Sequence, residues 1–297
     1  MRVIAICSAL SLFVSSAAIA AGVLGTKPSQ LTRSLSSVEN EQAMSRLIWA
    51  PGLDDGYVPQ GVAWVGGALY LSAYLSPTVG TKHCRLYKLD PASGDTLGRL
   101  DLPEGCGHAG GLAYAGKGIL IISDTRRLYR IDLAAAFPPG KPSRTVTADV
   151  TLRGALKGSF IDFDGSDMFV GSYEKEPGKA RGYFVPLSVF DKYNGESVDE
   201  SAALRSVALP QRAQGAGFDK AGRLWIAASS SQFGRVYRLD PKTGHIEASF
   251  EMPVGIEDIG FDDGGQFWSV SEAGSVRWQE WRESFPVLFR VDPGKLK

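Results

Sequence analysis

A five-residue phrase that returns along the chain constrains the fold more than any other feature of this sequence. It reads aliphatic, aromatic, basic, aliphatic, Asp, as in Leu86-Tyr87-Lys88-Leu89-Asp90. Further copies occupy residues 128–132, 236–240 and 288–292. The alternation of apolar and polar positions is typical of a half-buried strand. A Pro and a Gly follow three of the four copies and favour a turn there. Each copy is therefore predicted to be one strand.

A second unit lies upstream of each phrase and predicts a hairpin. It consists of a short strand, a Gly/Asp turn and an apolar strand that ends in small residues. Its five copies cover residues 61–72, 111–123, 160–172, 215–229 and 258–271. More variable segments, such as 97–102 and 246–252, are expected to supply an outer strand. Each repeat is thus predicted to hold four strands.

Four strands per repeat and a period of roughly fifty residues indicate an all-β fold, a single β-propeller. Five copies predict five blades, with six as the alternative. The third copy is degenerate, because residues 183–187 replace the basic-Asp phrase. The last copy has no fourth strand of its own. Residues 46–50 are expected to supply it and to close the ring, which hides edges that invite aggregation.

The length of 297 residues and the absence of a long linker favour one large domain. Apolar residues make up 44% of the chain, which is enough for a sizeable core. We expect a signal peptide at residues 1–20, a poorly ordered extension at 21–43, and the propeller at 44–297. Lys plus Arg equal Asp plus Glu at 32 each, so no nucleic-acid partner is expected. A monomer is the expected state.

The N-terminus predicts export to the periplasm or the outside. Arg2 precedes an apolar run at residues 3–20 that ends in Ala18-Ile19-Ala20, the pattern of a cleaved signal peptide. A transmembrane anchor is the alternative, because a run of this length nearly spans a bilayer. No basic stop-transfer cluster follows, so cleavage is favoured and no membrane span is expected afterwards. Cys84 and Cys106 then remain, and an oxidising compartment favours a disulfide between them over two free thiols.

Alignment of the five copies predicts a binding site at one mouth of the channel. The entrance position carries Gln60, Gly110, Ser159, Gln214 and Glu257. Two residues earlier, on the same face by strand periodicity, lie Val58, His108, Lys157, Arg212 and Gly255. The predicted ligand-binding residues are the polar ones: Gln60, His108, Lys157, Ser159, Arg212, Gln214 and Glu257. The two cations among them would favour an anionic group on a small polar ligand.

Loops after the second strand of each blade are expected to open on the same side. They carry Tyr74, Asp124, Tyr173 with Glu174, Ser230 and Glu272. Their carboxylates either complete a cation site or pair with Lys157 and Arg212. Glu257, Asp258 and His108 are the candidate ligands of one divalent cation, Ca, Mg, Mn or Zn. His108, Asp124 and Glu272 are the candidate catalytic residues, since a neutral imidazole or a carboxylate can act as a base near pH 7.

The entrance phrases resemble those of a family of secreted bacterial β-propellers. The phrases are Pro59-Gln60-Gly61, Gly107-His108-Ala109-Gly110-Gly111, Ser159-Phe160-Ile161 and Gln214-Gly215-Ala216. More distantly, the chain is similar to the senescence-marker-protein/gluconolactonase group, which implies metal-dependent lactone hydrolysis at the channel mouth. It departs from that group in carrying Gln60 at a metal-binding glutamate position, in lacking the asparagine-glycine entrance phrase, and in blade number. His108 and Glu257 also resemble the magnesium site of the streptogramin lyase group.

Two functions follow from these residues, and the sequence leaves open whether the protein is an enzyme. The first is an exported propeller that binds a small polar ligand or a protein partner at the mouth. The alternative is a hydrolase or lyase whose divalent metal, held by Glu257 and His108, polarises a carbonyl or activates water. Asp124 or Glu272 would then be the base. A scaffold that docks a partner on its outer strands is a third possibility.

Overall fold

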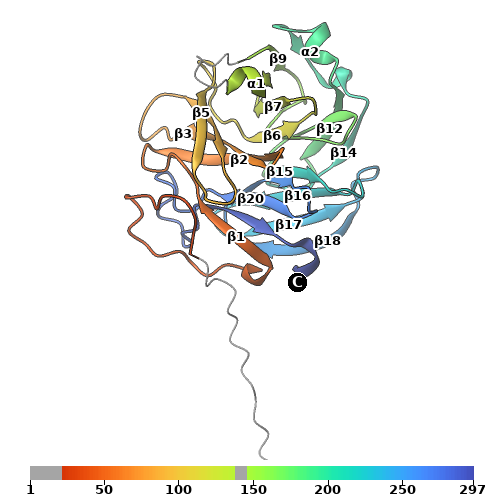
Figure 1. Ribbon diagram of the computed structural model, residues 1–297. Coiled ribbons are helices and arrows are strands. Elements are labelled where there is room, and N and C mark those ends of the chain that lie inside the picture. The colour runs from red at the N-terminus through yellow and green to blue at the C-terminus, as the bar shows by residue number, and fades with distance from the viewer. Residues whose placement is uncertain (1–21, 138–145) are drawn as a thin grey trace, which may run out of the picture.

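The computed structural model describes residues 22–137 and 146–297 (Figure 1). The predicted signal peptide lies outside these residues. Within them the strands form five antiparallel sheets of four strands, one of which gains a short fifth strand. The prediction of an all-β propeller is confirmed, with five blades rather than six. No helix of the described ranges is long and apolar enough to cross a membrane.

Four blades follow one another along the chain, each with its first strand innermost. The first blade contains β2 (Tyr57–Val65), β3 (Ala68–Leu75), β4 (Cys84–Leu89) and β5 (Thr96–Asp101). The second contains β6 (Gly111–Tyr114), β7 (Ile119–Asp124), β8 (Arg127–Asp132) and β9 (Ala148–Leu152). The third contains β10 (Phe160–Phe163), β11 (Asp167–Gly171), β12 (Arg181–Pro186) and β14 (Arg205–Ala208). The fourth contains β15 (Ala213–Phe218), β16 (Leu224–Ser229), β17 (Gly234–Leu239) and β18 (Ile246–Met252).

The fifth blade joins the two ends of the propeller. It contains β19 (Ile256–Phe261), β20 (Phe267–Ser271), β21 (Val287–Val291) and, outermost, β1 (Met44–Trp49). Strand β1 runs antiparallel to β21, and Leu47 lies opposite Phe289. Figure 1 shows β1 beside the C-terminal strands. The predicted closure of the ring by the N-terminal strand is therefore confirmed.

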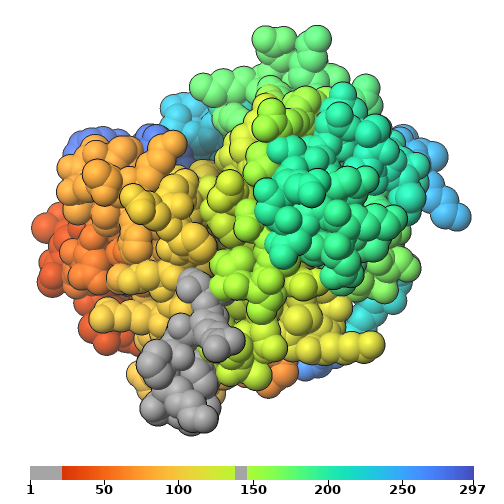
Figure 2. Space-filling view, turned by 90° about the horizontal axis from the view of Figure 1, so that it is seen from above, coloured from red at the N-terminus to blue at the C-terminus, as the bar shows by residue number. Residues whose placement is uncertain are grey.

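The innermost strands form the wall of the channel. Each contacts the next in the order β2, β6, β10, β15 and β19, and β19 returns to β2. Figure 2 shows the same chain order from outside, with successive colours side by side. Glycine allows the close approach, because a Cβ at Gly111 would lie 2.5 Å from the backbone nitrogen of Ile161 in the next blade. The inner strands thus bring one entrance loop from every blade to a common opening.

The third blade departs from the repeat, as its degenerate phrase indicates. After β12 the chain forms α2 (Val189–Lys192), β13 (Ser197–Val198) and η2 (Glu200–Ala202) before it returns as β14. Strand β13 pairs in parallel with β9 and so extends the second blade. The remaining short helices are η1 (Glu41–Ala43), α1 (Leu133–Ala136) and η3 (Pro293–Lys295).

Residues 22–43, for which the sequence predicts little order, make defined contacts with the propeller. Leu24 forms a parallel bridge with Ile48 of β1. Arg33 donates hydrogen bonds of 2.7–3.0 Å to the backbone carbonyls of Gln279, Trp281 and Arg282. The extension therefore reaches the loop between β20 and β21, which forms part of the mouth described next.

Candidate ligand-binding site

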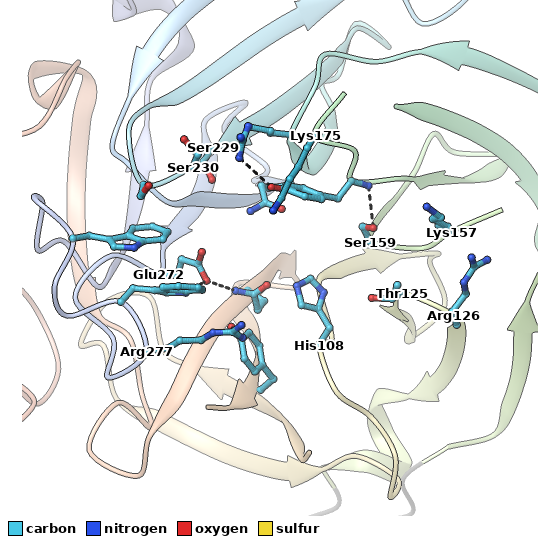
Figure 3. A pocket seen from close by; sticks show the side chains of 18 residues that line it. His108, Thr125, Arg126, Lys157, Ser159, Lys175, Ser229, Ser230, Glu272 and Arg277 are labelled. Carbon is cyan, nitrogen blue, oxygen red and sulfur yellow. Dashed lines mark hydrogen bonds between the residues drawn. The ribbon is translucent and has the colours of Figure 1, made fainter. Parts of the chain in front are cut away.

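A pocket of about 630 Å³ opens at the mouth to which the entrance loops lead (Figure 3). Every blade contributes to its wall. The lining residues are Gln60, Tyr74, His108, Thr125, Arg126, Lys157, Ser159, Tyr173, Lys175, Arg212, Gln214, Ser229, Ser230, Ser231, Glu272, Arg277, Trp278 and Trp281. Six of the seven predicted ligand-binding residues are among them. The seventh, Glu257, lies behind the wall and contacts it through Gln214. Their role in binding a ligand stays a prediction.

Two buried carboxyl groups belong to this region: Glu272 lines the pocket, and Glu257 lies behind its wall. Their residues are only 1% and 5% exposed, and Glu257 Oε2 has no hydrogen-bond partner among the described residues. Glu257 Oε1 accepts from Gln214 Nε2 at 3.1 Å. Glu272 Oε2 accepts from Gln60 Nε2 at 3.2 Å and from Trp278 Nε1 at 2.7 Å. Both carboxyl groups are thus held by uncharged donors.

Burial raises the pKa of both carboxyl groups, because removal from water disfavours the charged form. The charges of Glu272 and Asp258 raise the pKa of Glu257 further. For Glu272 the effect of burial is partly offset by the hydrogen bond from Trp278 and by the charge of Arg277, which leaves its pKa at about 7. The two groups therefore ionise less readily than ordinary surface carboxylates do.

Cationic side chains outnumber acidic ones around the opening. Five of the lining residues are cationic, and Glu272 is the single acidic one. The cations are Arg126, Lys157, Lys175, Arg212 and Arg277. Of these five cations, only Lys157 forms an ion pair with another described residue, namely Glu174 at 2.5 Å. Arg126 instead donates to the carbonyls of Gly154 and Leu156, each at 3.1 Å. The pocket consequently carries an excess of positive charge.

Aromatic rings form one wall of the pocket. The guanidinium of Arg277 lies 4.6 Å from the ring centroid of Trp278 and 5.5 Å from that of Tyr74. It also donates a hydrogen bond of 2.7 Å to the Tyr74 hydroxyl. Trp281 stacks on Trp278 with centroids 4.7 Å apart, and Tyr74 stacks on His108 at 5.7 Å. Flat groups can stack against such a wall.

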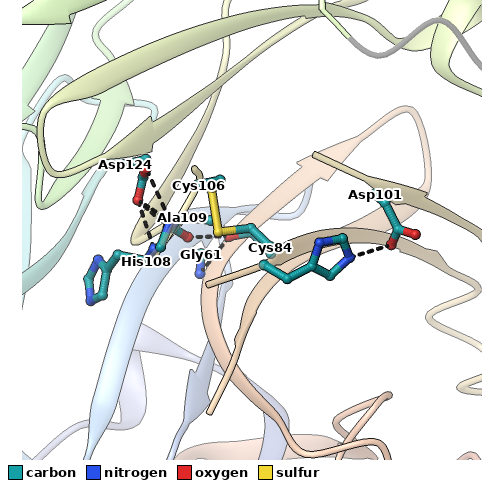
Figure 4. The surroundings of a disulfide bond; sticks show 10 residues. Gly61, Cys84, Asp101, Cys106, His108, Ala109 and Asp124 are labelled. Carbon is teal, nitrogen blue, oxygen red and sulfur yellow. Dashed lines mark hydrogen bonds and ion pairs between the residues drawn. A yellow bond between two sulfur atoms is a disulfide. The ribbon is translucent and has the colours of Figure 1, made fainter. Parts of the chain in front are cut away.

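Asp124, a candidate base, supports the entrance loop that carries His108 (Figure 4). Its carboxylate accepts the backbone N–H groups of Gly107, His108 and Ala109 at 2.7–3.2 Å. The predicted disulfide between Cys84 and Cys106 is confirmed and ties the same loop to β4. Burial lowers the pKa of His108, so its imidazole is neutral at pH 7. The structure thus gives Asp124 a positioning role for the loop.

The three candidate metal ligands do not gather around one point. Asp258 points between blades, where its carboxylate accepts the backbone N–H groups of Val62, Leu112 and Ala216 at 2.9–3.3 Å. In residues 22–137 and 146–297, one group of three metal-type side chains lies close enough to share an ion, namely Cys84, Cys106 and Asp124. Its two sulfur atoms are joined in the disulfide. Glu257, Asp258 and His108 do not form such a group in these ranges.

Several lining residues escaped the sequence analysis. Arg126, Arg277 and Ser231 lie in loops whose lengths differ between blades, so alignment of the repeats gives no reason to place them at the mouth. Trp278 and Trp281 stand outside the repeated phrases, so the repeat gives no reason to place them at the mouth, and both line the pocket. For Lys175, the only indication in the sequence is that it begins a charged loop at residues 175–179.

Comparison with known proteins gives the fold and no closer relationship. No family model matches the chain, and no curated protein matches it by sequence. Among solved structures, a glutaminyl cyclase from Myxococcus xanthus is similar over 80% of this chain and 90% of its own, with a TM-score of 0.53 and 16% identity. A PQQ-bound aldose sugar dehydrogenase from Streptomyces coelicolor is similar over 79% and 94%, with a TM-score of 0.48 and 14% identity. At such identities the likeness shows a β-propeller alone.

Proposed function

We propose that the mouth of this propeller binds a small anionic organic molecule. The observation that carries the proposal is the charge of the lining, with five cations and a single acidic residue that itself retains a proton near neutral pH. Concave sites lined by one sign of charge concentrate ligands of the opposite sign. A volume of about 630 Å³ suits a small molecule rather than a folded partner.

The aromatic wall adds a second element of selectivity. Trp278 and Trp281 present stacked rings beside Arg277. A ligand with a flat or unsaturated portion would stack on this surface while its anionic group meets Arg212, Lys175 or Arg126. A planar carboxylate is the simplest chemical class that combines both features, because guanidinium groups bind carboxylates in a matching planar geometry.

The metal-dependent hydrolase or lyase is less well supported by the geometry. It requires Glu257 and His108 to bind one ion, whereas Glu257 accepts a hydrogen bond from Gln214. The neutral His108 stacks on Tyr74. Asp258, the third candidate ligand, has both carboxylate oxygens occupied by backbone N–H groups. We therefore take ligand binding without a metal as the working function.

The disulfide supports function outside the cytoplasm. Disulfides persist in oxidising compartments and are rare in cytosolic proteins of most organisms. Together with the apolar leader, the bond between Cys84 and Cys106 favours a periplasmic or secreted protein. The ligand would then be a molecule of that compartment, and the protein would meet it as a monomer.

A matched series of probes tests the proposal. Benzoate, benzamide and benzylammonium share one ring and differ in charge, so their binding can be compared by tryptophan fluorescence or ligand-observed NMR. We expect benzoate to bind most tightly and benzylammonium most weakly. The double variant Lys175→Gln/Arg212→Gln should weaken benzoate about tenfold, the equivalent of about 1.4 kcal/mol.

The exposed Arg99→Gln change on the outer strand β5 removes a positive charge far from the pocket lining; it is the control and should leave binding unaltered. Equal affinity for the anionic and the cationic probe would contradict the proposal. So would a double variant that binds benzoate as well as the native protein does.

A further inference from the structure

A second cavity opens at the opposite end of the channel from the pocket described above. In β2, for example, Gln60 lines that pocket and Trp64 lies near the other end of the strand, beside the turn to β3. A cavity of about 450 Å³ lies among the corresponding strand ends and turns, and every blade contributes to it. We call this end of the channel the far mouth. It has no lining residue in common with the first pocket.

One aromatic side chain from every blade lines the far mouth. Each belongs to the last or next-to-last residue of an inner strand, and the five are Trp64, Tyr114, Phe163, Phe218 and Phe261. Each packs against a different core cluster of the molecule, yet none is fully buried. Packing between blades therefore accounts for part of each side chain, and the remainder borders the cavity. Aromatic side chains grouped in this way attract cations, because the face of each ring carries partial negative charge.

The charged residues at the far mouth have the opposite sign to those at the first. One lining residue, Lys220, is cationic, and four are acidic: Asp164, Asp219, Asp262 and Asp263. Of the four acids, only Asp219 and Asp262 form ion pairs with described residues, with Arg223 at 2.7 Å and with Arg290 at 2.6 Å. Lys220 donates to the backbone carbonyl of Asp263 rather than to a carboxylate. Two carboxylates thus remain to attract a positive charge.

These two carboxylates, of Asp164 and Asp263, are exposed and held in place by uncharged donors. Asp164 Oδ1 accepts the backbone N–H groups of Ser166 and Asp167, each at 2.8 Å. Asp263 Oδ2 accepts the indole N–H of Trp64 at 2.9 Å, so this charge lies directly beside one of the five aromatic side chains. Within residues 22–137 and 146–297, the acids of the far mouth do not gather closely enough to share a metal ion. Their spread suits a cation larger than a metal.

We infer that the far mouth is a second binding site, for a small organic cation with a quaternary ammonium group. Such a group spreads its charge over methyl groups that pack against aromatic rings, and aromatic cages recognise it for this reason. Carboxylates at the rim raise its local concentration. The cavity volume suits a free small molecule. This site does not depend on anion binding at the first mouth.

Choline and 3,3-dimethylbutan-1-ol are matched probes of this site, because they share one shape and differ in charge. Nitrogen-15 NMR of the tryptophan indole groups locates their binding, since Trp64 reports on the far mouth and Trp278 and Trp281 on the first. We expect choline to shift the Trp64 signal to saturation, with an affinity at least about tenfold above that of the alcohol. Equal affinity for the two probes, or a choline shift confined to Trp278 and Trp281, would overturn the inference.

Variants that keep the local structure test the two parts of the site. Asp164→Asn/Asp263→Asn removes both charges and keeps an oxygen that can accept the same hydrogen bonds, and should weaken choline about tenfold. Phe163→Leu removes one ring and keeps apolar bulk, and should weaken choline about threefold. The control Glu176→Gln/Glu280→Gln removes two exposed carboxylates from loops at the first mouth and should leave choline binding unaltered. Native affinity in either test variant would contradict the assignment.

Two competitors separate the organic cation from other occupants. Calcium that displaces choline at equal concentration would show that the carboxylates alone bind, as a metal site. Sedimentation of the protein with phosphatidylcholine vesicles would show that the mouth takes a lipid headgroup in place of a free molecule. Either result would overturn the inference, and we expect neither.

The same signals keep this site distinct from the proposed function. Benzoate should shift Trp278 and Trp281 in the native protein and in the far-mouth variants alike. Benzylammonium is itself an organic cation, so its binding counts against the first mouth only where it shifts Trp278 or Trp281. If choline fails to shift Trp64 while benzoate binds, the far-mouth site is wrong and the proposed function stands. The reverse result leaves the far-mouth site standing alone.

Discussion

Asp258 shows how much of this fold depends on one side chain. It is fully buried on β19 and accepts backbone N–H groups from β2, β6 and β15 of three other blades. Burial raises its pKa even though these hydrogen bonds favour the charged form. Its position at the centre of the ring makes it a link between blades that share no sheet.

Replacement of Asp258 by alanine should destabilise the protein severely. Three buried N–H groups would lose their acceptor, and each unsatisfied group costs about 1–3 kcal/mol. We expect the free energy of unfolding, measured in urea, to fall by several kcal/mol. Asp191→Ala, which removes an exposed partner of Arg130, is the control and should cost about 0–1 kcal/mol. A loss at Asp258 no larger than that of the control would contradict this role.

The sequence could not distinguish the roles of neighbouring residues such as Glu257 and Asp258. Both stand at the fifth entrance, and the repeat alignment assigned both to the mouth. The pairing of β19 with β20 shifts register between Ile256 and Ile259, and this irregularity interrupts simple alternation. Similar shifts occur at Pro59 and Val62 in β2. The amino-acid types do not reveal such bulges, so the sequence does not predict which way the side chains at the entrances point.

At the scale of whole elements, the loop between β20 and β21 owes its shape to a segment far away in sequence. This loop carries Arg277, Trp278 and Trp281 of the pocket wall. Arg33 in the N-terminal extension donates three hydrogen bonds to its backbone. The extension is therefore a support for the binding wall as well as a cover for the fifth blade.

Arg33→Gln should weaken ligand binding more than it weakens the fold. The shorter amide cannot reach all three carbonyls, so the tryptophan loop becomes less well positioned. We expect benzoate affinity to fall about threefold to tenfold, while the urea midpoint changes little, because exposed hydrogen bonds contribute modestly to stability. Arg99→Gln again serves as the control. A variant that binds benzoate like the native protein would show that the loop holds its shape without Arg33.

Elements that follow the repeat were predictable, and those that depart from it were not. The strand β18 has the bounds that the sequence indicates, and β1 closes the ring as expected. After β12 the chain passes through α2 and β13, and β13 pairs with β9 of the neighbouring blade. This pairing depends on how the two blades pack, so the repeat does not predict it. For the same reason, six entrance residues of the pocket were identified from the repeat, whereas Arg126 and Arg277, on irregular loops, were not.

At the scale of the whole molecule, buried and half-buried carboxyl groups give stability an unusual pH dependence. Burial raises the pKa of Asp162 to about 8, that of Glu272 to about 7, and those of Glu257 and Asp258 well above their ordinary values. Between pH 6.5 and 8 these groups are ionised in the unfolded chain but are wholly or partly protonated in the folded protein. The folded state therefore binds more protons, and the free energy of unfolding must fall as pH rises.

Thermal or urea unfolding at pH 6.5 and pH 8 should show the decrease. Each fully protonated group contributes up to about 1.4 kcal/mol per pH unit. Ionisation of His108, whose pKa is lowered by burial, matters only at more acidic pH and does not oppose the trend in this range. Glu272→Gln should reduce the slope, whereas Glu176→Gln should not. Equal stability at the two pH values would show that the buried groups ionise without cost.

The closure of the ring also dictates when this protein can finish folding. Leu47 and Phe289 face each other although almost the whole chain separates them. The fifth blade is incomplete until its C-terminal strand has been synthesised and, for an exported chain, carried across the membrane. Until then β1 lacks its partner strand. Contacts between residues so distant in sequence also form slowly. The last strand to be made, β21, is thus the strand that pairs with the first, β1. A nascent or truncated chain therefore has an open ring with two unpaired strand edges, which chaperones or other chains can contact.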